Sequence, residues 1–227
     1  MVLNLILKHC VICGYIGSNP CVYIRLPKGL PKTKRETASE LDIDVIKKNT
    51  DKPFGVFALF LAFTGCRRGE ALALTPSDID IENKVVRINK TVEWLGNHPH
   101  IKDSPKTEAG NREIPIPDSL IKHLMPLLGN NYIFQDQNGN LLDNSAAWRG
   151  WRNYQNAVGI SVTPHQLRHA YATMLFDAGI DVKTAQAVLG HADIKTTLGI
   201  YTHLSESRKI NSFERLRSYA DKFLTTV

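Results

Sequence analysis

A chain of 227 residues with 43% hydrophobic content is long enough to bury a substantial core, which excludes an intrinsically disordered protein. Its formal net charge of +6 favours a polyanionic partner. Three of the four cysteines lie near the N-terminus and Cys66 lies far from them, so there is no disulfide framework and no sign of secretion. We expect one large domain, or one domain and a fragment of another.

The first sixteen residues, MVLNLILKHCVICGYI, are strongly apolar and predict a helix that Asn19 and Pro20 stop. A lysine and a histidine interrupt the run, which is also shorter than the roughly 18 residues of a membrane span. We therefore expect a buried helix, whose packing partner would belong to a missing upstream domain. Cys10 and Cys13 form a C-x-x-C without a second pair at zinc spacing, so we interpret both as buried apolar side chains.

The next segment, PKGLPKTKRE, has the composition of a basic linker. Ser39 and Asp42 form a capping-box pattern that predicts the start of a helix, and the apolar run PFGVFALFLAF predicts another. Thr64 and Gly65 mark a break, after which Arg67 opens a further helix with Glu70 at i+3. Taken alone, Arg67 and Glu70 fit either a structural ion pair or part of a functional site.

From residue 84 the hydrophobic period changes to two, which is typical of strands. The segments KVVRIN, KTVEWL and NREIPI predict a small three-stranded antiparallel sheet, and residues 96–105 have turn chemistry. Lys106 falls on the loop before the third strand. Helical patterns then resume in DSLIKHLMPLLG and SAAWRGWRNYQNAVGI, so the fold class is mixed α+β and mainly helical.

Residues 163–201 contain the strongest candidate site. Thr163 and Pro164 predict a helix start that places His165 and Arg168 on one face of the first turns. A helix N-terminus already favours anions, so an imidazole and a guanidinium there predict a phosphate clamp.

The rest of this segment predicts three helical elements. Gly179 and Gly190 are expected to end the first two, Asp181 to cap the second, and a short helical turn from Asp193 to lead to Tyr201. The core face of the first helix is expected to carry four side chains: Leu167, Tyr171, Met174 and Leu175.

Four motifs occur in a fixed order: T-G-x-R with Glu70, the loop lysine Lys106, H-x-x-R, and L-G-H followed ten residues later by Tyr201. Together with their flanking residues (TGCRRGEALAL, PHQLRHAYATML, VLGHADIKTTLGIYTH), they resemble the tyrosine recombinase (phage integrase) family. The resemblance implies the DNA breaking-rejoining catalytic fold over residues 36–227, including the C-terminal tail. It also implies that residues 1–30 are the end of a core-binding domain, joined by a basic linker at 31–35.

By this resemblance, six residues are catalytic and Glu70 supports the first of them; the six are Arg67, Lys106, His165, Arg168, His191 and Tyr201. Tyr201 would attack a DNA phosphodiester, His165 would take its proton, and Lys106 would protonate the leaving 5′-oxygen. Cationic side chains would stabilise the phosphorane-like charge, so no metal, cofactor or ATP is expected. The resemblance implies a site-specific recombinase or integrase of a mobile element, which binds double-stranded DNA in the cytoplasm of a bacterium. It also implies a tetramer on paired sites and a possible monomer without DNA.

Three alternatives stay open. Asp78, Asp80 and Glu82 alternate in SDIDIE and could serve a metal-dependent nuclease, although solvation at a turn is the commoner reason for such a pattern. A DNA-binding module without catalysis fits the charge, and a type IB topoisomerase would share the tyrosine chemistry.

Overall fold

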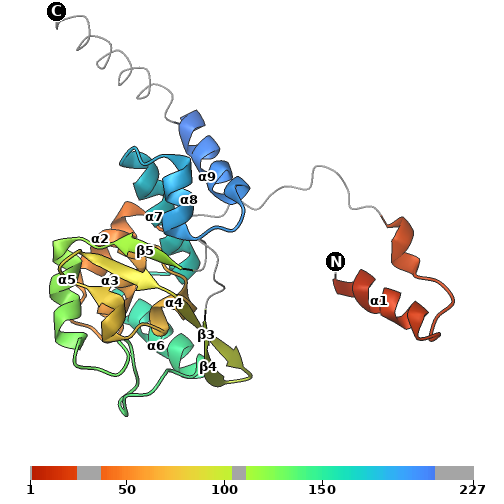
Figure 1. Cartoon of the computed structure of the whole chain (residues 1–227), viewed down its shortest axis with the longest axis horizontal. Helices are drawn as coiled ribbons and strands as arrows, with labels where there is room; N and C mark the ends of the chain where they lie inside the picture. Colours follow the sequence, from red (N-terminus) through yellow and green to blue (C-terminus); the bar gives the residue numbers. More distant parts are fainter. Residues whose placement is uncertain (1, 25–36, 104–110, 208–227) are drawn as a thin grey trace, which may run out of the picture. The chain divides into compact units, whose positions relative to one another are not determined.

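The structure is a computed structural model that describes residues 2–24, 37–103 and 111–207 (Figure 1). The chain divides into two compact units, Met1–Arg35 and Glu36–Val227. The smaller unit contains the helix α1 (Val2–Ile12) and the 3₁₀ helix η1 (Pro20–Tyr23). None of the described helices has the length and apolar character needed to cross a membrane.

The smaller unit departs from the sequence predictions in two ways. The helix α1 ends at Ile12, earlier than predicted, and Asn19 instead caps η1 by accepting a hydrogen bond from the Cys21 N–H over 2.9 Å. Within the described residues α1 has no buried residue, and η1 is the element it packs on, so the expected packing against an upstream domain stays a prediction. The prediction of two buried cysteines is wrong: Cys10 is half-buried, and Cys13 is exposed with its Sγ 3.4 Å from His9 Nε2.

The larger unit contains eight α-helices and five strands among the described residues. The helices are α2 (Glu40–Lys48), α3 (Gly55–Thr64), α4 (Arg68–Leu72), α5 (Asp118–Leu124), α6 (Asn144–Val158), α7 (Pro164–Asp177), α8 (Val182–Leu189) and α9 (Ile194–Ser207). The strands are β1 (Ile79–Asp80), β2 (Val85–Ile88), β3 (Lys90–Leu95), β4 (His98–Asp103) and β5 (Arg112–Pro115). Two 3₁₀ helices, η2 (Pro76–Asp78) and η3 (Met125–Leu127), complete it.

The apolar helix α3 forms the centre of the core. Eight of its ten residues are buried, and α2, α4, α5 and α7 all pack against it. Phe57 meets Phe134 and Trp151 edge-on, with ring centroids 5.0 and 6.2 Å apart, which ties α6 to the same core. The helix ends at Gly65, whose φ of 62° is left-handed, and a Cβ there would lie 2.4 Å from the Tyr171 ring. Only glycine therefore allows α3 and α7 to approach this closely.

The strands form two antiparallel pieces. In the three-stranded sheet β1-β2-β5, Val86 of β2 pairs with Ile79 on one side and Ile114 on the other. The strands β3 and β4 form a separate two-stranded sheet around a turn at Gly96, where φ is 64°. A mainly helical α+β fold with a small three-stranded antiparallel sheet is therefore confirmed.

The membership of the sheet was predicted incorrectly. The segment KTVEWL pairs with β4 and not with β2, and β1 supplies the third strand. The strand β4 falls within the stretch predicted as a turn because five of its six residues are exposed, so the sequence shows no alternation of apolar and polar residues.

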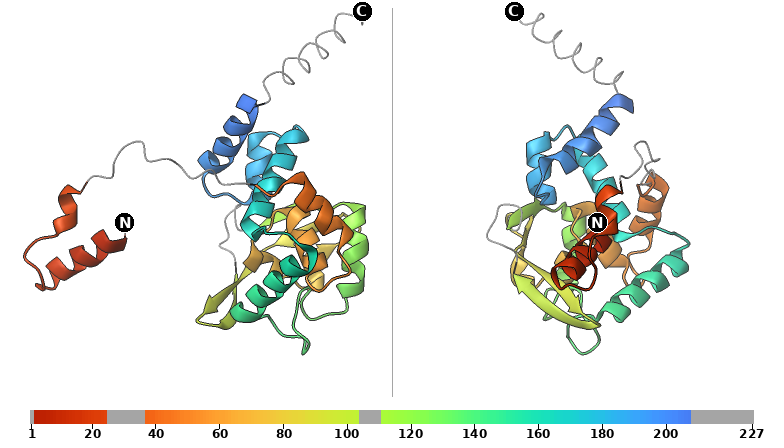
Figure 2. Two further views of the ribbon diagram at one scale, coloured as in Figure 1. Left: turned by 180° about the vertical axis from the view of Figure 1, so that it is seen from behind. Right: turned by 90° about the vertical axis from the view of Figure 1, so that its right-hand side faces the viewer.

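The helices α8 and α9 lie at one end of the unit, and the β3–β4 pair projects at the other end (Figure 2). The predicted helix starts and stops of this region are confirmed: Thr163 caps α7, Asp181 caps α8, and Gly190 ends α8 with φ of 65°. Two details were predicted incorrectly. Met174 is exposed, and Tyr201 lies within a 14-residue helix instead of after a short turn.

Candidate active site

Arg67 precedes α4 and is held by the first turn of that helix. Its backbone N–H donates to Glu70 Oε2 over 2.8 Å, and its Nη1 donates to Glu70 Oε1 over 2.7 Å. The predicted i, i+3 pair is therefore present. The Arg67 side chain remains half exposed whereas the Glu70 side chain is buried, so the carboxylate fixes a guanidinium that still faces solvent.

Arg168 lies in the second turn of α7 and is buried. Its Nη1 donates to the Gly65 carbonyl over 2.8 Å, and its Nη2 donates to the Leu189 carbonyl. Burial, together with the charge of Arg67, lowers the pKa of Arg168 to about 10, so this group stays cationic at neutral pH. Arg168 thus joins the end of α3 to the end of α8.

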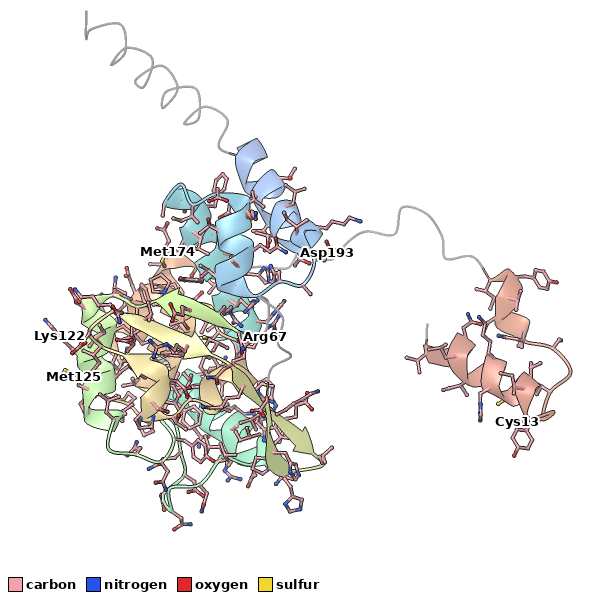
Figure 3. The ribbon with its side chains drawn as sticks, in the orientation of Figure 1. Cys13, Arg67, Lys122, Met125, Met174 and Asp193 are labelled. Carbon is pink, nitrogen blue, oxygen red and sulfur yellow. The ribbon has the colours of Figure 1, made fainter. Side chains whose placement is uncertain are left out.

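The C-terminal end of α8 collects three guanidinium groups. The carbonyls of Val188, Leu189 and Gly190 accept from Arg112 Nε (2.9 Å), Arg168 Nη2 and Arg67 Nη2 (2.9 Å), respectively. The last carbonyls of a helix lack donors within the helix and carry the negative end of its dipole, so cations are stabilised there. Figure 3 shows Arg67 where the sheet meets the α8 and α9 end of the unit.

His191 directly follows these three carbonyls. Its Nδ1 lies 2.8 Å from Thr197 Oγ1, and Thr197 is fully buried, so a side chain of α9 orients the imidazole. Burial, followed by the charges of Arg168 and Arg67, lowers the pKa of His191 to about 4. His191 is therefore neutral at pH 7 and offers one ring N–H.

His165 is an exposed residue in the first turn of α7 and contacts a second histidine. Its Nε2 lies 3.0 Å from Nε2 of His169, and the two rings are nearly perpendicular. At that distance one nitrogen must donate and the other accept. His169 therefore fixes the orientation of His165 in this structure.

A pocket opens beside these groups. Its lining comes from the loop before α4, from the first residue of α4, from α6 and from the start of α7: Cys66, Arg67, Arg68, Trp148, Thr163, Pro164, His165 and Arg168. Three cationic side chains and one imidazole face a single cavity at a helix N-terminus, which suits a phosphate group. The predicted phosphate clamp is thus extended by a segment far away in the sequence.

Tyr201 does not line this pocket. It is buried in the middle of α9, where its ring meets Phe176 edge-on with centroids 5.1 Å apart, and its hydroxyl has no hydrogen-bond partner among the described residues. Phe176 lies in the last turn of α7, eight residues or about 12 Å along the helix axis from Arg168. The structure therefore brings Arg67, Arg168 and His165 to one pocket. His191 is not among the lining residues but directly follows the carbonyls that hold both arginines, whereas Tyr201 packs elsewhere. Lys106 lies outside the described residues.

Sequence reasoning missed two arginines at this site. Arg112 points to the buried side of β5, together with Ile114, and clasps Glu70 with two hydrogen bonds. A charged residue at an inward position of a strand was the available signal. Arg68 lies between the rings of Trp94 and Trp148, 4.3 and 4.4 Å from their centroids, and no sequence pattern indicates that stacking.

The three acidic residues considered for a metal-dependent nuclease have other partners or face solvent. Asp78 pairs with Lys90 over 2.6 Å, Asp80 pairs with Arg87 and Asn83, and Glu82 is exposed. The ion pairs occupy carboxylate oxygens that a metal would need.

Comparison with known proteins identifies relatives of this chain. Residues 41–208 match the phage integrase family. A tyrosine recombinase XerC-like protein of Caldanaerobacter subterraneus subsp. tengcongensis is 33% identical over 89% of this chain and 60% of the relative. Tyrosine recombinase XerD of Lacticaseibacillus casei is 31% identical over 89% of this chain and 69% of the relative. The chain thus spans less than two thirds of the first relative and slightly more than two thirds of the second.

Solved structures share the fold. The Tn1549 transposon integrase in complex with circular intermediate DNA superposes with a TM-score of 0.70 at 23% identity, covering 94% of this chain and 78% of that one. A XerA recombinase superposes with a TM-score of 0.62 at 26% identity, covering 85% and 67%.

Proposed function

Because the chain belongs to the phage integrase family, we propose that it cleaves and rejoins duplex DNA through a covalent phosphotyrosyl intermediate, as a site-specific recombinase. One observation carries this proposal. Arg67 and Arg168, which are far apart in the sequence, both donate to main-chain carbonyls at the end of α8, one residue or two before His191. The fold thereby assembles a cationic group around one pocket.

The assembled groups suit the stabilisation of a phosphoryl transition state. Each guanidinium carries five N–H groups, and the hydrogen bonds to described residues use two in Arg67 and two in Arg168. The others are available to the non-bridging oxygens of a phosphodiester, which gain negative charge as an oxyanion attacks. His191, neutral and held by Thr197, would donate one further hydrogen bond. These side chains would supply the charge stabilisation that a divalent metal supplies in other nucleases.

Tyr201 would be the nucleophile. Its proton would pass to His165, its oxygen would form a bond to phosphorus, and the bond to the 5′-oxygen would break to leave a 3′-phosphotyrosine. The leaving 5′-oxygen would take a proton from Lys106. Since Tyr201 is packed on Phe176 and away from the pocket, α9 must move relative to α7 before attack.

The intermediate would allow rejoining without ATP. The phosphotyrosyl bond conserves the free energy of the broken linkage, so a 5′-hydroxyl from a second duplex can attack it and release Tyr201. We further propose that the active assembly is a tetramer on paired DNA sites and that it acts in the cytoplasm of a bacterium. Residues 1–30 would be the end of a core-binding domain, residues 31–35 a linker, and residues 36–227 the catalytic domain.

Covalent trapping on a nicked suicide duplex tests the proposal. We expect a protein–DNA adduct that forms equally well in excess chelator, because no metal takes part. No adduct from the wild-type chain would contradict tyrosine catalysis, and loss of the adduct in chelator would favour a metal-dependent nuclease. Efficient relaxation of a supercoiled plasmid that lacks a recombination site would favour the type IB topoisomerase alternative.

A further inference from the structure

Arg112 is almost completely enclosed, with 4% of its side chain exposed. It donates from Nη2 to Glu70 Oε2 over 2.6 Å, from Nη1 to Glu70 Oε1 over 3.2 Å, and from Nε to the Val188 carbonyl over 2.9 Å. All three directions of its planar fork are therefore used. The two acceptors belong to α4 and α8, which are far apart in the sequence.

The Glu70 carboxylate is shared between two arginines. Oε1 accepts from Arg67 and Arg112, and Oε2 accepts from the Arg67 backbone and Arg112. Burial alone would raise the pKa of Glu70, but the hydrogen bonds and charges of Arg112 and Arg67 outweigh it and leave this pKa lowered. Glu70 is thus a buried anion. The desolvation free energy of such a carboxylate is large unless a cation pairs with it. Arg112 supplies that pairing from inside the protein, while Arg67 approaches from the solvent side.

The contact with Val188 gives Arg112 a second role. Val188 is followed by Leu189 and Gly190, whose carbonyls hold Arg168 and Arg67, and then by His191. By donating to Glu70 and to Val188 at once, Arg112 fixes α4 relative to the end of α8. A lysine could pair with Glu70 but has no planar fork, so its ammonium could not make the bidentate contact and reach Val188 in the same geometry.

We propose that Arg112 is a positioning residue for DNA cleavage: it sets the mutual placement of Arg67 and His191 and does not contact DNA. The inference rests on the proposed function. It assigns to β5 a part in the reaction that the four motifs do not contain.

The variant Arg112→Lys tests this inference in the full chain. We expect affinity for a duplex carrying the recombination site to stay within about threefold, whereas the single-turnover rate of adduct formation falls about 30-fold or more, because a small displacement of transition-state donors is costly. Arg87→Lys is the matched control, since Arg87 lies on the neighbouring strand β2 and pairs on the surface with Asp80 and Glu113. We expect the control to cleave at the wild-type rate. Wild-type cleavage by an Arg112→Lys variant that binds DNA normally would overturn the inference.

A double-variant cycle separates positioning from a general loss of structure. If Arg112 acts through Glu70, the double variant Arg112→Lys/Glu70→Gln should cleave no more slowly than the slower of the two single variants. A rate reduction equal to the product of the two single reductions would overturn the inference. Should Arg112→Lys not fold, the neutral pair Arg112→Gln/Glu70→Gln avoids an unpaired buried charge. Slow cleavage with normal binding, at the rate of Glu70→Gln alone, supports the inference; wild-type cleavage, or a further loss beyond that of Glu70→Gln, overturns it. Failure of the proposed function would appear differently, as no adduct from the wild-type chain.

Discussion

The ring of Tyr201 lies edge-on against Phe176, with centroids 5.1 Å apart. Burial and the nearby carboxylate of Asp181 raise the pKa of Tyr201, which is unfavourable for a nucleophile. The arginines that could lower that pKa line a pocket to which Tyr201 does not contribute. Tyr201 would therefore have to leave this position, which we call its resting position, before it could attack a phosphate bound in that pocket.

Tyr201→Phe should abolish adduct formation without lowering stability. The buried hydroxyl has no partner among the described residues, so removing it sacrifices no observed hydrogen bond and leaves the contact with Phe176 in place. Covalent trapping and thermal unfolding would measure the two effects. Tyr154→Phe is the control, because the Tyr154 hydroxyl is likewise buried without a described partner but belongs to α6. An adduct from Tyr201→Phe at the wild-type level would exclude Tyr201 as nucleophile.

Phe176→Leu should accelerate the first cleavage event. The edge-on pair contributes about 0.5–1.5 kcal/mol beyond its buried area, and this free energy holds Tyr201 in the resting position. We expect about a 2- to 10-fold faster single-turnover rate in a rapid-quench experiment. Phe63→Leu, in a partly buried position of α3, should give no acceleration. An unchanged or slower rate in Phe176→Leu would mean that departure of Tyr201 does not limit cleavage.

Arg168→Ala should lower the cleavage rate by about 10²-fold or more while duplex affinity changes little, because one donor to the transition state is lost. The free energy of unfolding should fall as well, because the carbonyls of Gly65 and Leu189 would lose their donor. Each buried carbonyl left unpaired lowers that free energy by about 1–3 kcal/mol. Gel-shift, trapping and urea-unfolding experiments measure the three quantities. Lys47→Ala, on the exposed face of α2, is a control for loss of positive charge. A drop in affinity alone would argue against a transition-state role.

His191 should make the protein less stable in mild acid. Its pKa is about 4 in the folded protein and near 6.5 in the unfolded chain, so between these values the unfolded state binds more protons. The free energy of unfolding contributed by His191 is therefore complete above pH 6.5 and is lost as the pH falls towards 4. Urea unfolding at several pH values should show this decline, and His191→Gln should flatten it. An NMR titration should also find that DNA raises the pKa, because a phosphate stabilises the imidazolium.

Local interactions of the site could be predicted from the sequence. Helix geometry alone places Glu70 beside Arg67 and caps α7 with Thr163, because these contacts span only three residues. The gathering of Arg67, Arg112 and Arg168 at α8 could not be predicted in this way. Their acceptors are main-chain carbonyls, which every residue possesses, and the contacts depend on tertiary packing.

Other errors have physical causes of the same kind. The strand β4 pairs through its backbone while its side chains face solvent, so its sequence lacks the alternation expected of a strand. The position of Tyr201 depends on how α9 packs on α7. This is a tertiary contact, and the spacing of residues along the sequence does not determine it. The family resemblance names Tyr201 as the nucleophile, but it does not indicate that the ring packs on Phe176, eight residues along α7 from Arg168.

The use of Val188, Leu189 and Gly190 carbonyls as acceptors has a consequence for how this segment can vary. Substitution of the first two side chains removes no acceptor, so sequence drift there is compatible with an intact cluster. A single inserted or deleted residue within α8 is different, because it would rotate the terminal carbonyls by about 100° around the helix axis. The three arginines therefore depend on the length of α8, which sets where its last carbonyls point, more than on the side chains of α8.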